Sequence, residues 1–166
     1  FIEKINVITD VQSDQYSFSL KNKFNTDKIK EIDVVRLIND AKQQIIRNNK
    51  DSVILHLIVD KYIVDGEEYL EFPENLSYKK FVVEVSFITI QNSIVKTLNK
   101  IFRDCNIELK KIISHQYSSR FAEKNDTSPC IAGKKVIDGI NPSEVIMHNL
   151  YTRKEGLFEK IFNFFS

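Results

Sequence analysis

The sequence predicts an α+β fold, with a small three-stranded sheet and two helices packed on one of its faces. Two segments repeat apolar residues every three or four positions, as amphipathic helices do, and three segments have the apolar pattern of strands. They follow one another in the order helix, strand, strand, helix, strand, which is typical of an α+β domain. A chain of 166 residues is long enough for one core but short for two.

The first element is an N-terminal edge segment that we place at residues 1–24. In its second half Tyr16, Phe18 and Leu20 alternate with polar residues. This period of two is typical of a half-buried strand, and we expect it at the edge of the sheet.

The predicted domain covers residues 25–117 and begins with a helix. The Asn-Thr-Asp sequence at 25–27 is a capping signal, and apolar residues then recur from Ile29 to Ile45. The almost continuous aliphatic run at 53–59 predicts a central strand that is covered on both faces.

The second half of this domain repeats the pattern of strand, helix and strand. Apolar residues alternate with polar ones from Phe81 to Ile90, which predicts the second strand. Residues 91–93 then open a helix whose apolar face ends at Cys105, so we expect this cysteine to be a small core residue. Residues 107–113 form the third predicted strand.

The regular pattern is lost after Tyr117. Residues 118–154 carry Ser, Asn, Asp, Pro and Gly with little periodicity, and we interpret them as a linker.

The composition limits the classes of function. Lys and Arg total 24 against 23 Asp and Glu, so the global positive charge of a nucleic-acid binder is missing and we expect no nucleic-acid partner. No apolar run reaches the roughly 18 to 20 residues of a membrane-spanning helix. Two distant cysteines favour neither a disulfide framework nor a zinc site and fit a reducing cytoplasm.

The sequence offers little for catalysis, and we predict that the chain is not an enzyme and has no cofactor or metal. His56, His115 and His148 have no metal-ligand spacing and are interpreted as strand or surface histidines. Cys130 has no recognisable catalytic partner. The acidic residues Glu67, Glu68 and Glu71 lie in a predicted solvated loop. The four glycines form no phosphate-binding loop.

The C-terminal segment 155–166 predicts an amphipathic helix. At about 100° per residue its apolar side chains fall within an arc of roughly 160°, and burying six of them offers on the order of 10 kcal/mol on a bilayer surface. We therefore predict peripheral membrane binding, although docking on a protein core is an alternative. The membrane-binding residues are predicted to be Leu157, Phe158, Ile161, Phe162, Phe164 and Phe165, with Lys160 near the headgroups.

Three segments resemble the bacterial cell-division protein family FtsA. Residues 54–66, ILHLIVDKYIVDG, are similar to a segment of that family, with Asp60 where the family usually has Pro. Residues 31–41 resemble the helix before that segment, and residues 91–96 with 105–109 resemble the helix and strand after it. The match covers about residues 27–117.

The resemblance implies that this region is the strand-helix-strand-strand subdomain of FtsA, which mediates protein contacts and binds no ATP. It also implies a terminal amphipathic helix at the cytoplasmic face of the inner membrane, at the division site. The implied partners are membrane lipids and other division proteins or FtsA copies, with FtsZ contacted only indirectly.

The resemblance thus favours a division scaffold that tethers protein partners to the membrane without ATPase activity. The alternatives are a soluble α+β interaction domain unrelated to division and a remnant of an actin-like ATPase, whose phosphate loops this sequence lacks. As the docking surface we predict the sheet face away from the two helices and the loop from Glu67 to Lys80.

Overall fold

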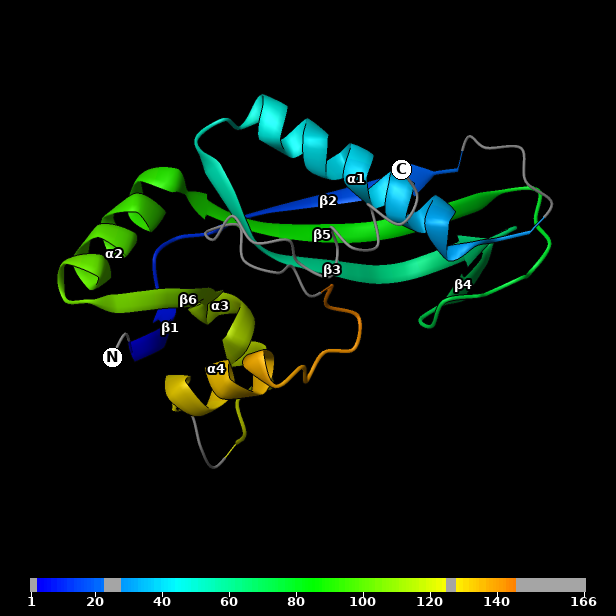
Figure 1. The fold of residues 1–166 in the computed structure, drawn as a ribbon. Coiled ribbons are helices and arrows are strands. Elements are labelled where there is room, and N and C mark those ends of the chain that lie inside the picture. The colour runs from blue at the N-terminus through cyan, green and yellow to red at the C-terminus, as the bar shows by residue number, and fades with distance from the viewer. Residues whose placement is uncertain (1–2, 23–27, 125–127, 146–166) are drawn as a thin grey trace.

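The structure is a computed structural model that describes residues 3–22, 28–124 and 128–145 (Figure 1). The elements in chain order are β1 (Glu3–Thr9), β2 (Asp14–Lys21), α1 (Glu31–Asn48), β3 (Ser52–Val64), β4 (Glu67–Tyr69), β5 (Phe81–Gln91), α2 (Asn92–Asp104), β6 (Ile107–Ser114), α3 (His115–Ser118), the 3-10 helix η1 (Ser119–Phe121) and α4 (Pro129–Ile137).

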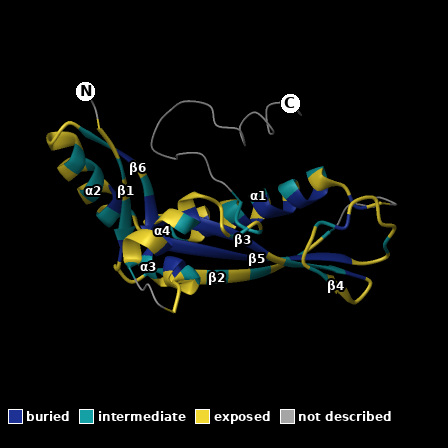
Figure 2. Ribbon diagram, turned by 90° about the horizontal axis from the view of Figure 1, so that it is seen from below, coloured by how far each residue is buried: buried dark blue, intermediate teal, exposed yellow. Residues whose placement is uncertain are grey.

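The main sheet is antiparallel with the strand order β2-β5-β3-β4. The pairing of β2 with β5 is regular, whereas β3 has two irregularities against β5, one of them between Val59 and Lys61. β3 and β5 are buried along most of their length because they lie inside the sheet, and β2 at the edge alternates between exposed and half-buried residues (Figure 2).

Helix α1 covers one face of this sheet. Its buried apolar residues pack with those of β3 and β5 in one cluster, to which the half-buried side chains of β2 also belong. The residues of α1 in this cluster are Val34, Leu37, Ile38, Ala41 and Ile45, and those of β5 are Phe81, Val83, Val85 and Phe87. This helix is amphipathic because its apolar residues recur with the helical period.

A second sheet consists of β1 and β6, which pair in parallel. Helix α2 packs against it through Val95, Leu98 and Phe102. Leu55 of β3 and Ile90 of β5 belong to the same cluster. The second sheet is therefore joined to the end of the main sheet by a shared apolar core.

The α+β class predicted from the sequence is confirmed, and the structure has more strands than predicted. The main sheet has four strands rather than three, because β2 and the short β4 add to β3 and β5. β6 pairs with β1 instead of joining that sheet, and α2 packs mainly over β6 while α1 covers the main sheet. Figure 1 shows α1 on one side of the main sheet and β1, β6, α3 and α4 on the other.

The predicted linker at 118–154 is wrong where the structure forms η1 and α4. Helix α4 buries Ala132, Gly133 and Val136, which are too small and too few to give a clear helical period in the sequence. A Cβ at Gly133 would lie 2.3 Å from Cδ1 of Ile8, so the glycine allows α4 to approach β1 closely. Pro129 opens the helix, a position that tolerates the missing N–H.

Residues after α4 return to the main sheet. The Val59 N–H donates to the Ser143 carbonyl at 2.9 Å, and the Val145 N–H donates to the Leu57 carbonyl at 2.9 Å. An isolated antiparallel bridge joins Ile58 and Glu144. This segment extends the sheet at the edge of β3, where a loose linker was expected.

Candidate interaction face

The face of the main sheet away from α1 carries a polar ladder, which we define as Ser17, Ser19, Asp60, Lys61, Glu68, Glu84 and Ser86. These side chains come from all four strands, since residues of one parity on each strand point to the same face. Asp60 is added to them by the irregularity of β3 between Val59 and Lys61. Ser17, Ser19, Asp60 and Glu68 are exposed, and Lys61 and Glu84 are partly exposed. The ladder therefore meets solvent and is available to a partner.

The first row of the ladder crosses three strands. The Oγ atoms of Ser17 and Ser86 lie 3.2 Å apart, and Ser86 donates to Oδ2 of Asp60 at 2.7 Å. Asp60 lies at the irregularity of β3, outside the regular pairing of Val59 with Val85 and of Lys61 with Glu84. The bulged backbone thus directs a carboxylate toward the centre of this face.

The second row alternates in charge. Lys61 Nζ lies 2.5 Å from Oε1 of Glu68 and 3.7 Å from Oε2 of Glu84, and Ser19 donates to Glu84 at 3.5 Å. The hydrogen bond to Glu68 raises the pKa of Lys61, so the ammonium stays charged. Exposed ion pairs of this kind contribute little to the free energy of folding. Alternating charges on a surface can favour a partner of complementary charge.

The loop beside this face is ordered by Asp65, whose carboxylate accepts hydrogen bonds from the backbone N–H groups of Lys79 and Lys80 at 2.7 to 3.1 Å. Asp65 and Gly66 have φ values of 50° and 100°, as the turn before β4 requires. Leu70, directly after β4, is 77% exposed. The predicted docking loop thus follows an ordered turn and carries two exposed apolar side chains, Leu70 and Leu76.

The other end of the same face is closed by a buried polar network. His56 of β3 donates from Nδ1 to Oε1 of Glu144 at 2.8 Å, and its Nε2 accepts the Ser114 N–H at 3.0 Å. The hydroxyl of Tyr117 donates to Oε2 of Glu144 at 2.9 Å and accepts from Asn141 at 3.0 Å. One carboxylate therefore links β3, α3 and the segment after α4.

The charges in this network follow from its geometry. Because Nε2 of His56 accepts a backbone N–H, the ring is neutral, and burial lowers the pKa of His56 accordingly. Burial alone would raise the pKa of Glu144, but the hydrogen bond from His56, nearby Lys111 and the bond from Tyr117 together lower it. Burial, with Glu144 alongside, raises the pKa of Tyr117, so the phenol stays protonated.

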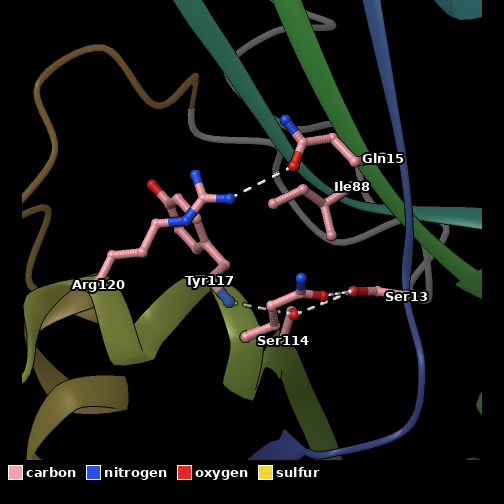
Figure 3. Close-up of a pocket in the computed structure, with 7 residues that line it drawn as sticks. Ser13, Gln15, Ile88, Ser114, Tyr117 and Arg120 are labelled. Atoms are coloured by element: carbon pink, nitrogen blue, oxygen red, sulfur yellow. Dashed lines mark hydrogen bonds between the residues drawn. The ribbon is translucent and has the colours of Figure 1, made fainter.

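A small polar seam lies beside this network, between the start of β2 and α3 (Figure 3). Arg120 donates to the side-chain oxygen of Gln15 at 3.3 Å, and the guanidinium stands 5.7 Å from the ring centre of Tyr117. Ser13 and Ser114 have their Oγ atoms 3.3 Å apart. The seam joins β2 to the elements that follow β6.

The structure places the other predicted residues as follows. His56 is a strand histidine as predicted, fully buried, and His115 is partly exposed with Nδ1 3.2 Å from Asp10. Cys105 is exposed, so its predicted core position is wrong, because α2 ends at Asp104 and turns this residue outward. Cys130 is also exposed.

The acidic residues of the predicted loop do not converge on one site. Glu67 accepts a hydrogen bond from Tyr69, whereas Glu68 pairs with Lys61. In the part of the chain that the structure describes, no group of three or more His, Cys, Asp or Glu side chains is arranged for a metal ion.

The predicted membrane-binding segment lies outside the described residues. This concerns Leu157, Phe158, Lys160, Ile161, Phe162, Phe164 and Phe165, as well as His148. Among the residues that are described, no helix is long and apolar enough to cross a membrane.

Sequence reasoning missed Glu144 as the centre of the buried network. Its signal was weak, since a single glutamate between Ser143 and Val145 follows a Pro in a segment without periodicity. Glu144 forms a strand-like bridge with Ile58, which lies 86 residues earlier in the sequence. A local sequence pattern does not indicate such a distant partner.

The fold defines an α+β domain, made of an antiparallel sheet with one long helix on it and a second small sheet at its end. Residues 9–89 match the family described as the SHS2 domain inserted in FtsA. The matched part runs from the end of β1 through most of β5, and the resemblance to FtsA is confirmed.

Two curated relatives show the extent of the similarity. The cell division protein FtsA of Escherichia coli (strain K12) is 23% identical over 109 residues, which cover 63% of this chain and 26% of the relative. The cell division protein FtsA of Buchnera aphidicola subsp. Acyrthosiphon pisum (strain APS) is 24% identical over 149 residues, which cover 82% of this chain and 35% of the relative. The match thus spans about a quarter to a third of these relatives.

Proposed function

We propose that this chain is a scaffold of the bacterial division apparatus that binds protein partners and is held at the membrane by its C-terminal segment. The observation that carries the proposal is the match of residues 9–89 to the SHS2 domain inserted in FtsA. The two relatives are named as cell division proteins. This similarity supports a role in division, and we place that role at the cytoplasmic face of the membrane as part of the proposal.

Partner binding is assigned to the polar ladder and the loop beside it. The ladder offers donors and acceptors that are already fixed by one another, and fixed side chains lose little entropy when a partner binds. Leu70, directly after β4, supplies an exposed apolar contact. Together these features suit a partner with a polar surface and an apolar pocket.

The proposed activity is binding without ATP hydrolysis. The four glycines of the sequence form no phosphate loop. The titratable residues of the buried network are tied to one another by hydrogen bonds that hold the fold together. A nucleotide that raised the melting temperature of the chain would favour the alternative of an actin-like ATPase.

Membrane binding is assigned to the apolar arc of residues 157–165, on the strength of the sequence pattern. Phe162 lies within this arc, and Asn163 lies at the middle of the polar side. A charge placed at the bilayer-facing side costs a few kcal/mol, while the same charge on the polar side costs little.

The test is co-sedimentation with liposomes of bacterial lipid composition. The full chain should pellet with the lipid, and both a version that ends at Lys154 and the Phe162→Glu variant should stay in the supernatant. Asn163→Glu is the matched control and should still pellet. If the truncated version pellets as well as the full chain, or the full chain does not pellet, the membrane-tether proposal fails and a soluble interaction domain takes its place.

A further inference from the structure

Strand β2 forms one edge of the main sheet. All eight of its residues pair with β5 without a bulge, and in residues 3–22, 28–124 and 128–145 no strand pairs with its other side. Its central residues, 15–20, carry neither charge nor Pro. Such an edge lacks the devices that usually prevent pairing with another chain. Figure 2 shows β2 along the border of the sheet, alternating between exposed and half-buried residues.

The outward-facing backbone groups of β2 can be identified. The N–H of Asn22 donates to the carbonyl of Phe81 on β5 at 2.9 Å. In an antiparallel pair the direction of the hydrogen bonds alternates along the strand. Tyr16, Phe18 and Leu20 therefore also direct their backbone groups to β5. The residues between them point their N–H and C=O groups outward, and these residues are Gln15, Ser17, Ser19 and Lys21.

We propose that β2 pairs with β2 of a second copy of this chain, antiparallel and about a two-fold axis, so that two main sheets become one. Only outward-facing residues can exchange hydrogen bonds, which restricts the register. The longest overlap places Ser17 opposite Ser19 of the second copy and Gln15 opposite Lys21. Because residues of the same parity pair, the α1 helices of both copies lie on the same side of the joined sheet.

This register sets apolar side chains opposite one another and places no like charges opposite each other. On the α1 face Phe18 meets Phe18 of the second copy, and Tyr16 meets Leu20. These three side chains are only half-buried in a single chain, so pairing buries apolar surface that β2 leaves open. No like charges stand directly opposite each other, because Asp14 faces Asn22 of the second copy and Lys21 faces Gln15.

This arrangement rests on the proposed function and names one partner for it, a second copy of the chain. It explains why the polar ladder reaches the edge of the sheet. In the joined sheet Ser17 and Ser19 continue the ladder across the two-fold axis. Lipid binding and self-association are measured in separate experiments, so failure of the dimer proposal can be distinguished from failure of the membrane-tether proposal.

The test is sedimentation equilibrium of the full chain over a wide range of concentration. We expect a concentration-dependent monomer–dimer equilibrium. The double variant Ser17→Lys with Ser19→Lys places like charges opposite each other at two positions and should weaken the dimer at least about tenfold. Both serines are exposed, so the fold tolerates lysines there. Ser17 is linked to Asp60 through Ser86, and Ser19 donates to Glu84, so each lysine has a carboxylate nearby.

The double variant Ser17→Thr with Ser19→Thr is the matched control and should remain dimeric with an unchanged melting temperature. Ser19→Pro is a second, independent variant, because it removes one outward N–H without a loss of pairing to β5, and it should also be monomeric. A full chain that stays monomeric at all concentrations, or folded lysine and proline variants that dimerise like the wild type, would overturn the proposal.

Discussion

On β5, the residues Val83, Val85 and Phe87 face α1 and are fully buried, whereas Glu84 and Ser86 of the same strand face away from it toward Lys61 and Ser17. The first face is an apolar layer and the second is a network of polar side chains. The apolar face supplies most of the free energy of folding, because burial of such side chains is the dominant stabilising effect. The polar face contributes less stability, and it is the face to which we assign partner binding in the proposed function.

The second face is itself divided. Near His56 it is closed by Glu144, Tyr117 and the elements after β6, and farther along β5 it remains open as the polar ladder. The closed half is polar and buried, so every group in it must be paired. The open half is polar and solvated, so its pairs are replaceable. Substitutions should therefore have graded effects, from the α1 face through the closed half to the open half.

The largest effect is expected on the α1 face. Phe87→Ala should lower the free energy of unfolding by about 3 to 5 kcal/mol, because it removes a fully buried ring that packs edge to face with Phe18. Urea unfolding followed by circular dichroism measures this. Ser86→Ala on the opposite side of the same strand is the control and should cost about 1 kcal/mol. Equal losses from the two variants would contradict the contrast between the faces.

The closed half should come next. Glu144→Ala leaves the Nδ1–H of His56 and the hydroxyl of Tyr117 buried without an acceptor, and should cost about 2 to 4 kcal/mol. Glu144→Gln keeps an acceptor oxygen in the same place and should cost less. The measurement is again urea unfolding. A loss below about 0.5 kcal/mol for the alanine variant, typical of a surface site, would mean that the network does not hold this part of the fold.

Acid should weaken the same half first. The pKa of His56 in the folded state is lowered below its ordinary value of 6.5. As the pH falls below that value, the unfolded chain takes up a proton that the folded ring resists, so stability present at neutral pH is lost. The pKa of Glu144 is also lowered, which adds a loss in the same direction once the pH falls below 4.5.

Lys111 and Arg120 are the cations near His56, and both oppose its protonation. The free energy of unfolding, measured at a series of pH values from 8 to 4, should therefore decline from about 6.5 downward. His56→Gln should remove the part of this decline above 4.5. A wild-type stability that rises on acidification through this range would refute the neutral assignment of the ring.

The smallest effect is expected on the open half. Lys61→Ala removes the contacts to Glu68 and Glu84, but these are partly solvated and should be worth less than about 0.5 kcal/mol. Thermal melting at low and high salt measures this. If this variant destabilised the chain as strongly as Glu144→Ala does, the polar ladder would be a structural element and not a free surface.

Much of the main sheet could be predicted from the sequence because its signals are local. The strand predicted at 81–90 is β5 at 81–91, and the strand at 107–113 is β6 at 107–114. The helix predicted from residues 25–27 begins at Glu31 in the structure. The apolar pattern sets the helix, whereas its first turn depends on packing against the loop at Leu76, whose carbonyl accepts the Ile29 N–H.

The remaining features depend on contacts between distant residues. β1 finds β6 about 100 positions away, as in the pairing of Ile5 with Leu109. The need for glycine at position 133 comes from its contact with Ile8. The role of Glu144 comes from its hydrogen bond with His56. The residues next to each of them in the sequence do not indicate its distant partner. A linker was therefore predicted where the chain folds back onto its own sheet.

The most direct test of this account is native-state hydrogen exchange at Val145, whose amide donates to Leu57, in the wild type and in Glu144→Ala. We predict that this amide is strongly protected in the wild type, that it loses protection in the variant, and that the amide of Val85 inside the sheet stays protected in both. If Val145 exchanged in the wild type at the rate of an unstructured peptide, the segment after α4 would not close the sheet, and the division of the second face into a closed and an open half would be wrong.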